Sequence, residues 1–161
     1  MTNIKKLSQA GILIALGVVC STLFIPVGPA KVFPVQHMIN VFAAVTLGPA
    51  YGVSMAFITS LIRVSIGTGS LLAFPGSMVG ALLSGLLYKV TKKTWTAFLG
   101  EVVGTGLIGA VLAYPVAALI MSKEAALFGF VIPFGISSFA GAVISVVLIK
   151  KYRRKRSEQR A

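Results

Sequence analysis

The sequence predicts an all-α integral membrane protein, a compact bundle of six transmembrane helices with both termini cytoplasmic. Of the 161 residues, 57% are hydrophobic and 11% are charged, which leaves too little polar surface to enclose a soluble core. Twelve of the fifteen Lys and Arg residues fall in three clusters, at 5–6, 89–93 and 150–160, separated by long apolar runs. Because basic segments stay on the cytoplasmic side, both ends and one middle loop are placed inside, and the number of crossings must be even.

A helix needs about 20 apolar residues to cross the hydrocarbon layer, and six segments are candidates. Residues 1–161 are expected to form a single transmembrane domain with a basic cytoplasmic tail, 150–161, and spans at about 7–25, 35–48, 49–66, 71–88, 95–121 and 126–149. The short second span is expected to form a tight hairpin with the third, turning at Gly48-Pro49 on the inner face. Pro115 is expected to kink the fifth span near its outer end.

The outer loops are expected at about 26–34, 67–70 and 122–125. Four crossings are the alternative, if the second span and the segment near Gly67 are re-entrant. Small residues four positions apart predict close helix packing. They occur as Gly76, Gly80 and Ser84, as Gly100 and Gly104, and as Ser137, Gly141 and Ser145.

The charge and the motifs exclude several classes of protein. Most of the net charge of +12 flanks apolar spans, so anionic membrane lipids rather than nucleic acid are the expected partner. We find no Walker-type loop, nucleophile elbow, paired carboxylates or HExxH motif, so the chain is not expected to be an enzyme, and energy from ATP must come from another chain. No cofactor is expected, and no metal either, since the single histidine has no Cys or His cluster beside it.

Two charged residues are expected inside the membrane. Arg63, near the outer end of the third span, either snorkels to the outer headgroups, faces a water-filled cavity or clamps a flanking loop. Thr59 and Ser60 extend its polar face. Glu101 is the one acid expected within the membrane, about two turns into the fifth span. A Glu101–Arg63 pair stays open, because the expected depths differ by roughly 10 Å at about 1.5 Å per residue.

Gln36, His37 and Asn40 share one helical face at the outer start of the second span. His37 is either a capping or core residue or a ligand contact. A neutral imidazole beside two amides suits hydrogen bonding to a small heterocycle. Further along the chain, Tyr114 is a candidate to stack on a planar ring near the outer face.

The motifs together resemble the ThiW family, substrate-binding S components of energy-coupling factor (ECF) vitamin transporters. The matching residues are Pro34–Asn40, Gly48-Pro49, Arg63, Gly67-Thr68-Gly69, Phe74-Pro75-Gly76 and Gly100–Thr105. The resemblance covers essentially the whole chain. It implies a multi-pass subunit of a bacterial or archaeal plasma-membrane ABC transporter of the ECF type. This subunit would capture the thiamine precursor hydroxyethylthiazole outside, and a T component with two ATPase subunits would drive its release inside.

By the same resemblance, the ligand lies under the 26–36 loop. The implied ligand-binding residues are Gln36, His37, Asn40, Arg63, Glu101 and Tyr114. The family's Ala-xxx-Ala motif, which docks on the T component, corresponds to Gly11 and Ala15, with glycine in place of the first alanine. Ordinary internal packing is the alternative role for these two residues.

Other functions remain open from the sequence. Within the same class, the ligand could be the pyrimidine precursor or thiamine. In a different class, the chain could form a self-assembling, holin-like pore that conducts ions without ATPase partners. A neutral thiazole would be held by enclosure, ring stacking and a few hydrogen bonds, without a fixed countercharge.

Overall fold

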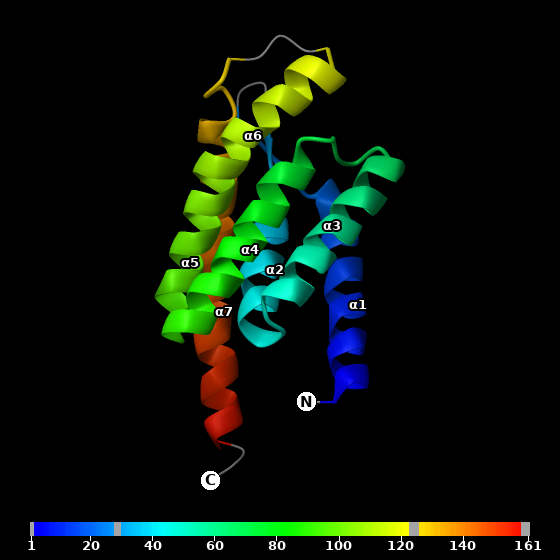
Figure 1. Ribbon diagram of the computed structural model, residues 1–161. Coiled ribbons are helices and arrows are strands. Elements are labelled where there is room, and N and C mark those ends of the chain that lie inside the picture. The colour runs from blue at the N-terminus through cyan, green and yellow to red at the C-terminus, as the bar shows by residue number, and fades with distance from the viewer. Residues whose placement is uncertain (1, 28–29, 123–125, 159–161) are drawn as a thin grey trace.

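The computed structural model describes residues 2–27, 30–122 and 126–158, and within these ranges it contains six helical stretches (Figure 1). Four are single helices: α2 (Pro34–Thr46), α3 (Pro49–Ser65), α4 (Ala73–Thr91) and α7 (Val131–Glu158). The first, α1 (Asn3–Val19), continues into one 3₁₀ turn, η1 (Cys20–Thr22). The fifth is composite: α5 (Thr94–Val103), η2 (Gly104–Gly109), α6 (Ala110–Pro115) and η3 (Val116–Ile120). The all-α prediction with six helices is confirmed.

Two details differ from the expected element boundaries. The last helix begins at Val131 rather than near 126, and residues 126–130 lie outside it. The loop after α1 contains a short antiparallel hairpin of β1 (Ile25–Val27) and β2 (Ala30–Val32), with Ile25 opposite Val32. These strands are only three residues long, too short for an alternating pattern to stand out in the sequence.

By length and composition, four helical stretches in the described part of the chain could cross a membrane: Asn3–Thr22, Ala73–Thr91, Thr94–Ile120 and Val131–Arg154. The hairpin helices α2 and α3, with 13 and 17 residues, are shorter. The start of α1 and the end of α7 lie at the same end of the bundle (Figure 1). An even number of crossings requires this arrangement.

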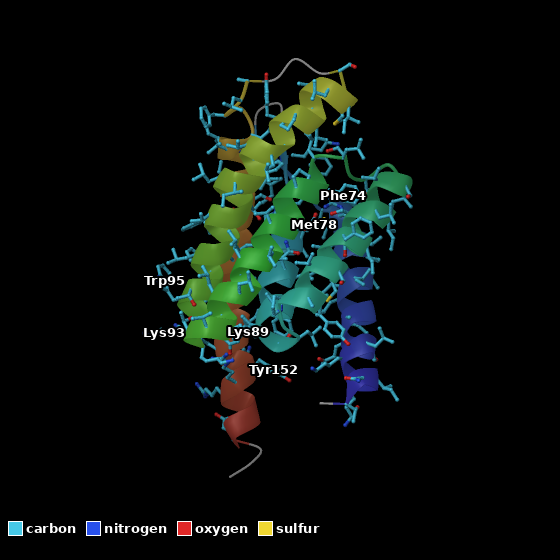
Figure 2. The ribbon with its side chains drawn as sticks, in the orientation of Figure 1. Phe74, Met78, Lys89, Lys93, Trp95 and Tyr152 are labelled. Carbon is cyan, nitrogen blue, oxygen red and sulfur yellow. The ribbon has the colours of Figure 1, made fainter. Side chains whose placement is uncertain are left out.

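Basic and aromatic side chains gather at that same end of the bundle. Figure 2 shows Lys89, Lys93 and Trp95 beside the lower turns of α4 and α5, and Tyr152 on α7. The Arg153 side chain also donates a hydrogen bond to the Tyr88 hydroxyl, joining α7 to α4. This distribution is typical of the cytoplasmic interface of a membrane protein.

Helix α2 lies at the centre of the bundle, with apolar contacts on two sides. One buried cluster joins α2 to α1 and α3 through Ala10, Ile39, Ala43, Leu47 and Met55. The other joins α2 to α5 and α7 through Val41, Ala97, Phe98, Ala142 and Ile149. The remaining face of α2, which carries its polar residues, is therefore directed at α4 and α5.

The predicted tight turn between α2 and α3 is present. Gly48 adopts a φ of +99°, a conformation that glycine reaches without steric cost, and Pro49 begins α3. A Cβ on Gly52 would lie 3.5 Å from the Ala44 backbone, so the two helices pack closely just beyond the turn.

Glycines bring the backbones of α4 and the composite fifth helix together at three levels. A Cβ on Gly104 would lie 2.8 Å from the Gly80 Cα, and one on Gly109 would lie 2.6 Å from the Gly76 Cα. A Cβ on Gly100 would lie 2.6 Å from the Ser84 amide nitrogen. There is no room for a side chain at any of these crossings, which confirms the prediction drawn from the small-residue spacing.

The fifth helix also bends as expected. In Figure 1 its outer part leans away from the line of α5 and over the top of the bundle. The wider π-helical segments η2 and η3 lie on either side of α6, which ends at Pro115. Proline cannot donate a backbone hydrogen bond, and π segments are a common response to such a gap.

We predict that Gly104→Ala lowers the stability of the folded bundle, because the added methyl would meet the Gly80 backbone and force α4 and α5 apart. The expected loss is about 1–3 kcal/mol, the usual cost of overpacking. Thermal unfolding in detergent measures it. Gly135→Ala is the matched control, since a Cβ at Gly135 meets no atom within 4 Å. Equal unfolding temperatures for the two variants would contradict the close packing.

Candidate functional site: a buried polar network

Polar side chains from four neighbouring helical stretches meet inside the bundle. Each is at most 8% exposed. They are Gln36, His37 and Asn40 of α2, Ser60 of α3, Ser77 of α4, and Glu101 and Thr105 of the fifth helix. In an apolar bundle such groups must satisfy one another, so their hydrogen bonds define the site.

Ser77 joins the two amide side chains of α2. Its Oγ accepts hydrogen bonds from Gln36 Nε2 at 2.9 Å and from Asn40 Nδ2 at 3.1 Å. Asn40 Nδ2 also lies 3.2 Å from the Ser77 carbonyl oxygen. A carbonyl can only accept, so this contact assigns the Asn40 atom as the amide nitrogen.

Glu101 is wholly buried, and all the hydrogen-bond contacts of its side chain are made by one of the two carboxyl oxygens. Oε1 lies 2.8 Å from His37 Nδ1, 3.1 Å from Asn40 Nδ2 and 3.2 Å from Thr105 Oγ1. Oε2 has no hydrogen-bond partner among the described residues. Gly80 makes room for the carboxylate, since a Cβ there would lie 2.9 Å from Oε1.

The direct contact between His37 and Glu101 corrects the expected depths. The sequence places His37 at the outer opening of a span and Glu101 near the inner side. Helix α2 has only 13 residues, however, and so extends about 20 Å at about 1.5 Å per residue. It begins after the hairpin and part-way into the bundle, where His37 reaches the level of Glu101.

Packing of α7 against α2 keeps His37 at the depth of Glu101. A Cβ on Gly141 would lie 2.7 Å from the Met38 amide nitrogen and 2.8 Å from the His37 Cβ. The first turn of α2 therefore rests directly on the backbone of α7. Among the described residues no side-chain hydrogen bond caps the start of α2, so the capping alternative for His37 is not observed.

Arg63 does not snorkel, since it is only 1% exposed. Its guanidinium carbon lies 4.3 Å from the centroid of the Phe33 ring, and Nη2 lies 3.4 Å from the Thr68 carbonyl oxygen. Nε has no partner among the described residues. The observed ion pairs of the described chain are His37–Glu101 and Arg154–Glu158, so Arg63 and Glu101 do not pair.

Arg63 thus clamps the segments that flank it, one of the roles the sequence left open. Phe33, which follows the hairpin, also donates its backbone N–H to Ser137 Oγ of α7 at 2.8 Å. Ser21 Oγ donates to Thr68 Oγ1 at 2.9 Å and so joins the end of α1 to the α3–α4 loop. Together these contacts tie the outer connections down over the polar network.

The remaining predicted residues lie elsewhere. Tyr114 is half-buried on α6, nine positions beyond Thr105 and therefore about 13 Å further along a helix axis, and among the described residues it makes no hydrogen bond to the network. Gly11 and Ala15 are exposed on α1, and a Cβ on Gly11 would meet nothing within 4 Å. Internal packing does not account for these two small residues.

Sequence reasoning missed Ser77 and Thr105 as members of the site. Serine and threonine are common in membrane helices, where they often bond to their own backbone, so neither residue type signals a site by itself. Among the described residues, no group of three His, Cys, Asp or Glu side chains is placed to hold a metal. The network consists of one carboxyl, one imidazole, two amides and three hydroxyls, which suits hydrogen bonding to a small polar solute.

The fold and the family matches define a membrane transport component. A solved structure described as the S component of a bacterial ECF transporter superposes with a TM-score of 0.75; it is 22% identical and covers 99% of this chain and 100% of its own. The chain belongs to the ThiW family of thiamine-precursor transporter proteins, whose model matches residues 7–155. Curated proteins provide no match.

We predict that Ser77→Ala destabilises the protein, since it removes the closest acceptor of the buried Gln36 amide, whereas Asn40 keeps the backbone carbonyl of residue 77 and Glu101 Oε1. Leaving buried donors unsatisfied costs about 1–3 kcal/mol. Ser84→Ala is the matched control on the same helix: Ser84 is also buried, but its Oγ has no hydrogen-bond partner in the part of the chain that the structure describes. Thermal unfolding of both variants in detergent measures the difference. A Ser77→Ala variant as stable as Ser84→Ala would show that the network contributes nothing to folding.

Proposed function

We propose that this chain is the substrate-binding S component of an ECF-type transporter that takes up hydroxyethylthiazole. The family model, which describes thiamine-precursor transporters, supports the substrate class. The superposition on an S component supports the division of labour, in which separate T and ATPase subunits supply the energy. In this proposal the bundle resides in a bacterial or archaeal plasma membrane with both termini cytoplasmic.

The observation that carries the proposal is the buried network of Gln36, His37, Asn40, Glu101 and Ser77. A soluble enzyme would need groups aligned on a reacting atom, whereas these side chains are aligned on one another in the membrane interior. Such a preformed set of donors and acceptors can exchange an internal hydrogen bond for one to a solute. Arg63, tied to the overlying segment, and Tyr114, further out on α6, complete the proposed lining.

The charge of the site favours a neutral ligand over thiamine. Arg63 is buried without an acidic partner among the described residues, while Glu101 is already engaged by His37. A cationic ligand such as thiamine would add a second unbalanced positive charge to a region of low dielectric, which is unfavourable. Hydroxyethylthiazole carries no charge and avoids this cost.

We predict that the purified chain, with no T component or ATPase present, binds hydroxyethylthiazole at one site and more tightly than the pyrimidine precursor or thiamine. Equilibrium binding in detergent measures the three affinities. The double variant His37→Ala and Asn40→Ala should lose most of the affinity, provided that it still folds. Val147→Leu, at an exposed position on α7, is the control that should bind as the wild type does.

Selective binding of another compound would keep the transporter class and replace the substrate. Oligomers that conduct ions without ATPase partners, with no binding of any of the three compounds, would favour the pore. Unchanged affinity in the folded double variant would remove His37 and Asn40 from the site.

We propose that Gly11 and Ala15 form the surface of α1 that docks on the T component. Exposed small residues four positions apart let another helix approach closely. We predict that Ala15→Leu weakens assembly with the T component and lowers uptake, while solute binding by the isolated chain stays unchanged. Co-purification with the T component measures assembly, and Val147→Leu again serves as the control. Full assembly of Ala15→Leu would place the docking surface elsewhere.

A further inference from the structure

We propose that His37 recognises a hydrogen-bond donor on the solute through its Nε2 atom, and that Glu101 is a positioning residue that sets the required tautomer. The inference rests on the proposed function, since it concerns the solute bound at that site. It specifies the chemistry that the solute must present: a hydroxyl or amino hydrogen, which for hydroxyethylthiazole is the hydroxyl of its side chain.

The first step concerns the proton between His37 and Glu101. Their close contact joins Nδ1 to Oε1, and either atom could carry the hydrogen. Asn40 Nδ2 also points at Oε1, and its identity as a donor follows from its contact with the Ser77 carbonyl. Because Oε1 already accepts from Asn40 and also lies within hydrogen-bond reach of the Thr105 hydroxyl, we infer that it carries no proton and accepts from His37, so that Nδ1 carries the hydrogen.

The second step concerns the other ring nitrogen. With the proton on Nδ1, the Nε2 atom of a neutral imidazole has a free lone pair and can only accept. Nε2 makes no hydrogen bond to the described residues, and the His37 side chain keeps 10% exposure while Glu101 keeps none. Glu101 therefore lies behind His37 and His37 meets the solute, the arrangement in which a carboxylate orients an imidazole.

The third step concerns charge. A fully ionised His37–Glu101 pair would require two nearly buried groups to lose their hydration, which its Coulomb attraction repays only with complete hydrogen bonding. The hydrogen bonding of this pair is incomplete, since Glu101 Oε2 has no partner among the described residues. The other charged side chain of this region, Arg63, lies against Phe33 and Thr68 and does not supply Oε2 with a partner. A pair in which neither group is charged, with the Glu101 proton on Oε2, avoids this cost and leaves Oε1 as the acceptor for Nδ1.

The consequence is a polarity rule for the solute. A ring nitrogen such as that of thiazole is an acceptor and gains nothing from a second acceptor at Nε2. A hydroxyl hydrogen fits this atom. The ethyl analogue of the thiazole, which lacks the hydroxyl, should therefore bind about 5- to 150-fold more weakly, which corresponds to the roughly 1–3 kcal/mol that an unmet buried polar group costs.

Two measurements test the proposal. His37 is the single histidine of the chain, so ¹⁵N-histidine labelling yields one imidazole to assign. We expect a neutral ring protonated at Nδ1, and an Nε2 resonance that shifts with hydroxyethylthiazole but not with the ethyl analogue. Titration of both compounds into the wild type and into His37→Phe should show the preference for the hydroxyl in the wild type alone.

Two variants of Glu101 test whether this residue sets the tautomer of His37 or only stabilises the fold. Glu101→Gln keeps an oxygen in place of Oε1 and should keep the Nδ1 proton, whereas Glu101→Met removes the acceptor and should release a mixture of tautomers. Should Glu101→Met fail to fold, the wild-type tautomer and the comparison of the two thiazoles still decide the question.

An imidazolium, a proton on Nε2, or affinities for the two thiazoles within about twofold of each other would overturn the inference. Failure of the proposed function would look different. In that case hydroxyethylthiazole itself would not bind, while the tautomer of His37 would still be measured in the unliganded protein.

Discussion

The structure depends on one constraint: a carboxyl group inside an apolar bundle has to be satisfied by its neighbours. Glu101 meets it with His37, Asn40 and Thr105, all directed at the same oxygen. These partners come from α2 and from the next turn of its own helix, so the carboxyl is satisfied at the depth and rotation that α2 adopts. Ser77 extends the same network to α4, so three helices are aligned by hydrogen bonds rather than by apolar contact alone.

Glycine makes this alignment possible. Apolar surface provides little specificity between helices in lipid, where close packing and polar contacts have to supply it. Gly80 contributes to close packing and to the polar contacts. Because it has no side chain, the fifth helix can approach α4, and space is left for the Glu101 carboxyl. Gly141 has a comparable role on the opposite side, where α7 supports the turn of α2 that presents His37. The small residues are thus part of the site as well as of the packing.

The outer connections complete the region through a second buried charge. Arg63 has no acid beside it among the described residues and relies on the face of Phe33 and the carbonyl of Thr68. A cation held on an aromatic face is stabilised by the ring quadrupole, most strongly when water is excluded. The segment that follows the hairpin is thereby attached to α3, while Ser137 attaches it to α7.

The sequence by itself determined the membrane class, the six helices, the turn at Gly48, the close glycine contacts and the polar face that carries Ser60 and Arg63. These follow from composition, hydropathy and local spacing, which act along the chain. The hairpin, the membership of Ser77 and Thr105, and the contact between His37 and Glu101 were decided only by the tertiary structure. Hydropathy predicts the depth of a residue in the membrane only from its distance to the end of its own span. Which residue a buried polar group contacts depends also on how far each helix is displaced along its axis and rotated about it. Packing of whole helices against one another decides both, and for α2 it moved His37 to the level of Glu101.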